Sequence, residues 1–122
     1  MHTVTDNGKY LKVDIPSNSS IGEVTAALQE EFSHPEYYRR NDIWEFGNGA
    51  LALQFFDLDR LTERILHLYP QNATRRKTAI VVQPGMNEAF AKLWSETTGR
   101  LPYAVQIFSD LTTAETWINE NN

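Results

Sequence analysis

The chain has 122 residues, 41% of them hydrophobic, which predicts one ordinary domain over residues 1–122 with a single core. Sixteen acidic residues against eleven basic ones give a formal net charge of −5, and this balance argues against the basic face of a nucleic-acid-binding protein. The lack of cysteine excludes disulfides and thiol nucleophiles, and no run approaches the ~20 apolar residues of a membrane span, so we expect a complete cytoplasmic protein without stable membrane insertion.

The first two predicted strands form a hairpin. Residues 2–5 and 9–15 are rich in β-prone side chains, and Asp6-Asn7-Gly8 separates them. Asn-Gly between two such runs is a strong hairpin signal, because both residues tolerate positive φ. Apolar residues occupy alternate positions from Leu11 to Ile15, so one face of this strand should be buried and the other wetter.

The first predicted helix begins with a capping box made by Ser20 and Glu23. It ends before Pro35, because the residue before a proline avoids the α region. Residues 43–46 then form the third predicted strand. The apolar stripe of the helix consists of Ile21, Val24, Leu28 and Phe32.

A glycine turn, Gly47-Asn48-Gly49, ends the third strand. Residues 50–56 fit either an antiparallel excursion or an ordered loop across the sheet edge. Asp57 is the expected N-cap of a second helix, which stops at Pro70. The apolar stripe of that helix consists of Leu58, Leu61, Ile65 and Leu68.

The last third of the chain alternates strictly between strand and helix. Parallel strands need a crossover that is usually helical and nearly always right-handed, so this alternation indicates an α/β fold. We expect an N-terminal hairpin followed by repeated right-handed α–β units, with about five strands in a mostly parallel mixed sheet and about four helices. Thr112, with Glu115, is the expected cap of the last helix. The alternating segments are strand 77–82, helix 87–97, strand 103–108 and helix 112–119.

The same topology makes a prediction about the second face of the sheet. If each strand is added beside the previous one through right-handed crossovers, all the helices lie on one side and the opposite face lacks a helical cover. Polar alternation in residues 10–15 supports a partly polar second face, whereas Ala79 to Val82 is apolar on both faces, as a central strand should be. Such a face is wetted, shielded by residues 50–56, or used for a partner, and the open edge predicts a two-fold homodimer.

The order of elements resembles the STAS domain, the fold of SpoIIAA-type anti-sigma-factor antagonists, over nearly the whole chain. A closer similarity is to the bacterial SpoIIAA-like branch shared with lipid-carrying CRAL-TRIO domains. It is carried by the ending Val105-Gln106-Ile107-Phe108-Ser109-Asp110-Leu111, followed by Ala114 and Trp117-Ile118. The resemblance implies a non-enzymatic regulatory module that binds a protein partner. The alternative that it implies is a carrier of a small or lipid-like molecule.

The chain departs from the antagonist pattern at the phosphorylation site. In that family a serine at the start of the second crossover helix is phosphorylated, which abolishes partner binding. No serine occurs between Ser33 and Ser95, and the helix start carries Asp57 and Asp59 instead. The resemblance therefore implies a module without the phosphorylatable serine. Either the carboxylates mimic the phosphorylated state, or they are ordinary cap and first-turn acids that complement the helix dipole.

Catalytic and metal-binding patterns are not apparent in the sequence. The pair Glu63 and His67 has helical spacing, but a zinc site needs three or four ligands. No nucleophile elbow or phosphate-binding glycine loop occurs. We therefore predict no enzyme activity, no cofactor and no metal site.

Candidate ligand- or partner-binding residues follow from the α/β fold, because ligands gather beyond the carboxyl ends of the strands. Gln83-Pro84-Gly85 also leads into a helix whose free backbone donors could hold an anion, although an ordinary βα turn explains it as well. The predicted residues are Gly47, Asn48, Gly49, Asp57, Asp59, Gln83, Pro84, Gly85 and Asn87.

Overall fold

The computed structural model describes residues 1–47, 55–69, 77–83, 92 and 101–120. None of the helices in these ranges combines the length and apolar character needed to cross a bilayer. The predicted helix 87–97 lies outside the described residues, as does most of segment 50–56. The described elements are β1 (Thr3–Asp6), β2 (Leu11–Ile15), α1 (Ile21–Phe32), β3 (Asp42–Phe46), α2 (Phe55–Leu68), β4 (Lys77–Val81), β5 (Ala104–Phe108) and α4 (Leu111–Ile118).

The five strands form one mixed sheet whose order follows the chain, β1-β2-β3-β4-β5. Strands β1 and β2 are antiparallel, and β2, β3, β4 and β5 run parallel to one another. The predicted α/β fold with an N-terminal hairpin is thereby confirmed. Strand β4 is buried along its whole length, as expected of a central strand.

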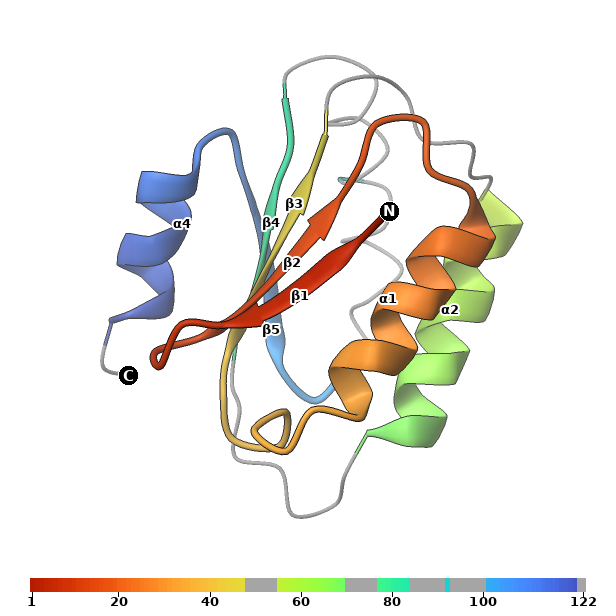
Figure 1. Ribbon diagram of the computed structural model, residues 1–122, viewed down its shortest axis with the longest axis horizontal. Coiled ribbons are helices and arrows are strands. Elements are labelled where there is room, and N and C mark those ends of the chain that lie inside the picture. The colour runs from red at the N-terminus through yellow and green to blue at the C-terminus, as the bar shows by residue number, and fades with distance from the viewer. Residues whose placement is uncertain (48–54, 70–76, 84–91, 93–100, 121–122) are drawn as a thin grey trace.

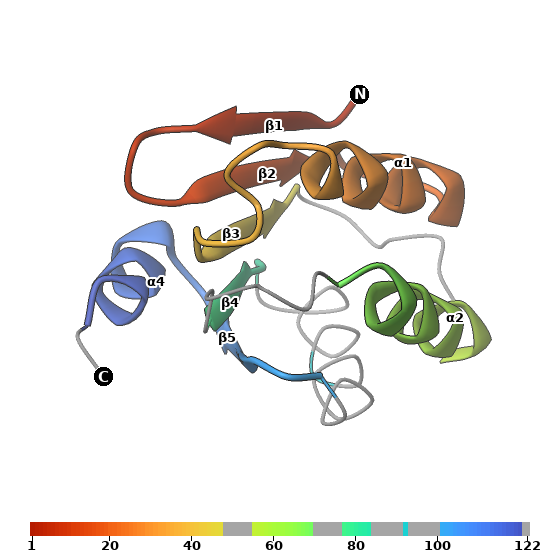
Figure 2. The same cartoon turned by 90° about the horizontal axis from the view of Figure 1, so that it is seen from below.

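Helices cover both faces of the sheet, which corrects the prediction that all of them lie on one side. Helices α1 and α2 pack on one face, and α4 packs on the other (Figures 1 and 2). The crossover rule applies to a helix between two parallel strands. Because α4 follows the last strand and returns to no further strand, it is free to cover the second face.

The two faces bury two hydrophobic clusters. On the α1 and α2 side, alternate residues of β3 such as Trp44 and Phe46 point into the larger cluster. On the α4 side, Ile43, Ala79 and Phe108 form the smaller cluster with Ala114 of α4. The period-2 alternation of each strand thus separates the two cores.

The hairpin between β1 and β2 is confirmed, but its turn is longer than a two-residue Asn-Gly loop. The strands pair from Asp6 and Leu11 outward, which leaves four residues in the loop. Only Gly8 of the predicted Asn-Gly pair has positive φ, at 89°. The side chain of Asn7 instead accepts hydrogen bonds from the backbone N–H groups of Lys9 and Tyr10, both at 2.9 Å.

Two helix starts differ from the predicted caps. Asp110, and not Thr112, caps α4, since its carboxylate accepts the N–H of Thr113 at 2.8 Å. This contact lowers the pKa of Asp110. Helix α2 begins at Phe55, so Asp57 is its third residue and does not cap it. Ser20 does cap α1, accepting the N–H of Glu23 at 3.3 Å.

Helix α4 is held on the sheet by two polar contacts. The Tyr10 hydroxyl donates to Glu115 at 2.5 Å, and burial together with this contact raises the pKa of Tyr10 to about 12. At the other end of α4, the buried Lys77 ammonium donates to the carbonyl of Trp117 at 2.7 Å and to that of Glu120 at 3.2 Å. A cation at the carboxyl end of a helix is favourable because it satisfies free carbonyls and complements the dipole.

A histidine clamp joins the segment before β1 to α1. The reciprocal half of the capping box is absent, because the Glu23 carboxylate binds the backbone N–H and the Nδ1 atom of His2. The Nε2 atom of His2 lies 2.8 Å from Glu30. Contact with Glu23 raises the pKa of His2, and the same contact lowers the pKa of Glu23. Both ring nitrogens face a carboxylate, which favours the imidazolium form.

The substitution His2→Gln should therefore reduce stability in a pH-dependent way. The contribution of His2 is full below its ordinary pKa of 6.5 and is lost as the pH rises through the raised value. That of Glu23 is full above 4.5 and is lost as the pH falls through the lowered value. Urea unfolding at a series of pH values measures the free energy of unfolding, and the difference between His2→Gln and wild type should be largest between pH 4.5 and pH 6.5. The control His67→Gln, at an exposed position of α2, should show no such window, and a pH-independent loss in His2→Gln would contradict the clamp.

Candidate functional site

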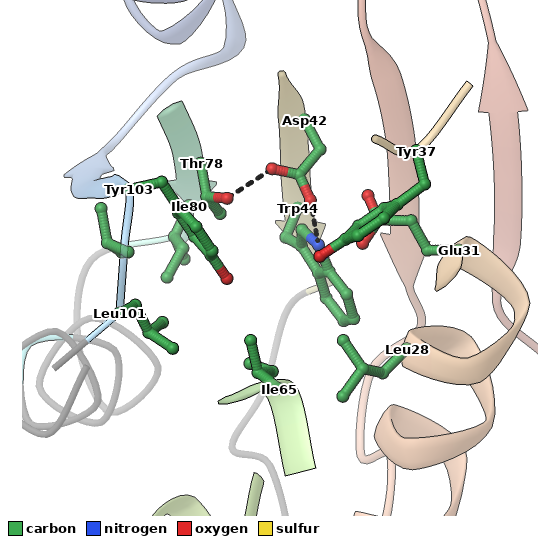
Figure 3. A pocket seen from close by; sticks show the side chains of 11 residues that line it. Leu28, Glu31, Tyr37, Asp42, Trp44, Ile65, Thr78, Ile80, Leu101 and Tyr103 are labelled. Atoms are coloured by element: carbon green, nitrogen blue, oxygen red, sulfur yellow. Dashed lines mark hydrogen bonds between the residues drawn. The ribbon is translucent and has the colours of Figure 1, made fainter. Parts of the chain in front are cut away.

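A small cavity lies between the sheet and helices α1 and α2. It sits at the amino ends of β3 and β4 and beside the last turn of α1 (Figure 3). Its described lining combines an apolar floor with carboxyl, hydroxyl, indole and phenol groups. The lining residues are Leu28, Glu31, Tyr37, Asp42, Trp44, Ile65, Thr78, Ile80, Leu101, Tyr103 and Val105.

Asp42 is the central polar residue of the cavity. It is the first residue of β3 and points to the same face as Trp44 and Phe46, so the strand buries a carboxyl group against the hydrophobic core. One carboxyl oxygen accepts the Thr78 hydroxyl at 2.5 Å, across the register pair Asp42–Thr78 of β3 and β4. The other accepts the indole N–H of Trp44 at 3.1 Å. These bonds fix the orientation of the carboxyl group.

Glu31 brings a second carboxyl group to the same cavity. It lies on the buried stripe of α1, seven residues after Val24 and three after Leu28, and only 1% of it is exposed. Side chains three and seven residues apart share one helix face. The last turn of α1 therefore directs an acid, where the stripe would ordinarily carry an apolar residue, toward the start of β3.

Aromatic rings enclose the polar groups. The hydroxyls of Tyr37 and Tyr103 point toward the cavity from opposite sides (Figure 3). Tyr69 links them, with ring centroids 6.0 Å from Tyr37 and 5.3 Å from Tyr103, and Phe32 lies 4.5 Å from Tyr37. Such contacts give the rings fixed positions. The cavity is thus a rigid aromatic enclosure around two acids.

The size of the cavity limits what it can hold. Its free space amounts to about 20 Å³, which accommodates about one water molecule. Drug-sized ligands occupy pockets of roughly 300–1,000 Å³. This cavity therefore fits a water-sized group and does not fit the body of a lipid.

Two of the sequence-predicted site residues meet elsewhere, in an open hollow at the carboxyl ends of the strands. Gly47 and Gln83 line this hollow of about 350 Å³ together with Asp14 and Glu45. Gly47 also has a structural reason to be glycine, since a Cβ atom there would lie 2.8 Å from the backbone nitrogen of Ser17. The residues that follow β3 and β4 therefore lie close together, as predicted, at the carboxyl ends of the strands. The enclosed cavity lies at the opposite, amino ends of the same strands.

Of the remaining predicted site residues, only Asp59 has a described side chain, and it lines neither place. Asp57 and Asp59 lie in the first turns of α2, and the side chain of Asp59 is exposed. The other predicted residues, Asn48, Gly49, Pro84, Gly85 and Asn87, lie outside the described residues. Within the described ranges, no three histidine, aspartate or glutamate side chains are placed to hold a metal ion.

The enclosed cavity was missed because sequence reasoning looked only beyond the carboxyl strand ends. Two signals could have revealed it. Asp42 directly precedes Ile43 and falls on the face of Trp44 by period 2, and Glu31 falls on the apolar stripe of the first helix. An acid at a core position of a helix or strand departs from the usual pattern, in which core positions are apolar and surface positions are polar.

Comparison with known proteins adds no relative. No family model, no curated protein and no solved structure matches the chain significantly. The geometry of the site is therefore the basis for a functional proposal.

The bond between Thr78 and Asp42 should be measurable as stability. Thr78→Val keeps the shape of the side chain and removes the donor, so the buried Asp42 oxygen loses a partner and the free energy of unfolding should fall by about 1–3 kcal/mol. Thr78→Ser keeps a hydroxyl and should lose less. Urea unfolding of both variants measures the difference, and equal losses would show that the methyl group, not the hydrogen bond, matters.

Proposed function

We propose that this chain is a non-enzymatic α/β module of the STAS type that binds a small ligand by a water-sized polar group which enters the enclosed cavity. The observation that carries the proposal is the convergence of Glu31 and Asp42, two buried acids from different elements, on one preorganised space. The STAS assignment itself is supported by the order of a hairpin followed by parallel strands with crossover helices.

The energetic cost of this arrangement favours a function over a structural role. A carboxyl group is stable in a core only where hydrogen bonds or charges compensate its lost hydration, which is a demand that an apolar side chain does not make. A leucine at position 31 or a valine at position 42 would suit a stripe and a strand that need only pack. Residues that stay polar at such a cost are typical of binding sites.

The contacts also define the roles of individual residues. Trp44 and Thr78 orient the Asp42 carboxyl group through the two bonds described above. Tyr37 and Tyr103 supply hydroxyls that donate or accept. The apolar residues around them exclude bulk water, which strengthens each polar contact with a ligand. The lipid-like ligand implied by the resemblance would need space beyond this cavity.

Native mass spectrometry on protein purified gently from its own host tests the proposal. We expect a small-molecule mass that persists under mild activation and is lost on denaturation. Val105→Ile adds one methylene group to a lining residue, close to the free volume, and should reduce the retained mass. Val4→Ile makes the same change away from the cavity and should not. A clean apo spectrum for wild-type protein would contradict ligand binding.

A second candidate function, a regulatory protein-interaction module, is favoured by the part of the second sheet face that α4 leaves open. On this part, Lys12 of β2 lies 2.7 Å from both Asp14 and Glu45. Burial lowers the pKa of Lys12, but its bonds to the two carboxylates outweigh this effect and raise it overall. Asp14 and Glu45, the acidic pair, border the hollow that Gly47 and Gln83 also line. A charged surface therefore lies next to a concave one.

This second module would work without a phosphorylatable serine, since Asp57 and Asp59 occupy the helix start where the antagonists carry it. Its partner would instead contact the acidic pair Asp14 and Glu45 beside the hollow. The predicted homodimer and the cytoplasmic location stay predictions.

Affinity capture at near-endogenous concentration tests the second candidate. The double variant Asp14→Arg/Glu45→Arg should lose a protein that wild type recovers, because the acidic pair is reversed beside the hollow. Asp59→Arg/Glu63→Arg makes the same charge change on exposed α2 and should keep that protein. Recovery of no protein by wild type, or of the same protein by both variants, would contradict this surface.

A further inference from the structure

We infer that residues 1–6 form a releasable strap, which the histidine clamp of His2 with Glu23 and Glu30 holds closed and which opens as the pH rises, uncovering the edge of β2. The shallow burial of β1, the contacts of His2 and the surface beneath the strap lead to this inference. The strap itself is independent of the proposed functions, whereas its link to the hollow rests on the second candidate function.

Strand β1 has little apolar surface to hold it on the sheet. It lies at the outer edge and, in the described structure, pairs with β2 (Figure 2). Thr3, Thr5 and Asp6 are exposed, and Val4 packs against the larger cluster but is only partly buried. Local opening costs least where few apolar side chains are buried. Strand β1 can therefore open without unfolding of the central strands.

The two ends of the strap are held by different contacts. At the hairpin end, the Asp6 carboxylate lies 3.2 Å from the guanidinium of Arg40. At the free end, the backbone N–H and Nδ1 of His2 contact Glu23, and its Nε2 lies 2.8 Å from Glu30. Of the two ends, the free end alone contains a histidine, the side chain that titrates nearest to neutral pH. A rise in pH should therefore release the free end, with the hairpin loop as the hinge.

The loss of one proton from His2 weakens the clamp. An imidazolium donates from both ring nitrogens, whereas a neutral imidazole has one donor and one acceptor, so one nitrogen then directs a lone pair at a carboxylate. Contact with Glu23 raises the pKa of His2. The closed form is thus fully favoured below pH 6.5 and loses this support as the pH rises through the raised value. The other charged groups near this end are the α-amino group of Met1, which also acts on Glu23, and Asp14 of β2.

The strap also covers part of the acidic surface beside the hollow. Met1 lines the hollow with Asp14 and Glu45, and the Thr3 hydroxyl donates to Asp14 at 3.4 Å. Opening removes both contacts and leaves the backbone groups on this edge of β2 without their strand partner. A partner of the second candidate function would then reach a wider surface, so the strap places access to this surface under the control of pH.

Amide hydrogen exchange of the full chain, followed by NMR, tests the strap. Protection factors compare the intrinsic exchange rate with the measured rate at each pH and so report the opening of each strand. Protection in β1 should be well below that in β4, which is buried along its length. Low urea concentrations should reduce only the protection of β4, because release of the strap exposes little surface. Equal protection with equal urea dependence in both strands would overturn the strap.

The pH dependence of the same measurement tests the clamp. From about pH 6 to about pH 8.5, protection in β1 should fall about three- to tenfold, since the partly exposed contacts of His2 contribute modestly. His2→Gln should show the low value already at about pH 6 and should not change with pH. It keeps the Met1 amino group, so a fall that persists in this variant, or no fall in wild type, would overturn the role of His2.

A matched variant and a separate readout complete the test. His67→Gln, at an exposed position of α2, should show the same exchange as wild type at both pH values. Failure of affinity capture would contradict the second candidate function and leave the exchange result unaffected, so the strap and that function can fail separately.

Discussion

The constraint on which the whole structure depends is the sequential order of the parallel strands. Because β2, β3 and β4 are neighbours in chain order, the two described crossovers, through α1 and α2, pass over the same side of the sheet. This side receives α1 and α2 and becomes the larger core. Among the described helices, α4 alone lies on the other side, where Tyr10 and Lys77 hold it in place. Because α4 is shorter than the sheet is wide, it covers one part of the second face and leaves the part around Lys12 without a described helix (Figure 2).

The strand order also determines where polar groups can be buried. The last turn of α1 lies beside the starts of β3 and β4, so a side chain at the end of the helix and side chains at the amino ends of the strands share one space. Glu31, Asp42 and Thr78 occupy it. Asp42 and Thr78 are register partners, so their bond joins the two central strands and positions the cavity at once.

Much of the fold could be predicted because local signals agreed with the tertiary structure. The alternation in β2, the Ser20 cap of α1 and the strands β4 and β5 with the final helix α4 each have a local physical cause. The cap at Asp110 was missed because Thr112, with Glu115 three residues later, matches the capping-box pattern, whereas α4 begins one residue earlier, at Leu111. The side of the sheet that α4 covers is likewise set by packing and not by periodicity.

The enclosed site was harder to predict because it consists of exceptions to the pattern that identified the fold. Glu31 interrupts an apolar helix stripe, and Asp42 precedes an apolar strand on its buried face. Each exception alone reads as a helix end or a strand end. They are eleven positions apart in sequence, and only the packing of α1 against β3 shows that they meet. Two departures from a consistent pattern that converge on one cavity are the reason to regard it as the candidate site, since violations of local rules tend to concentrate at functional or strained positions.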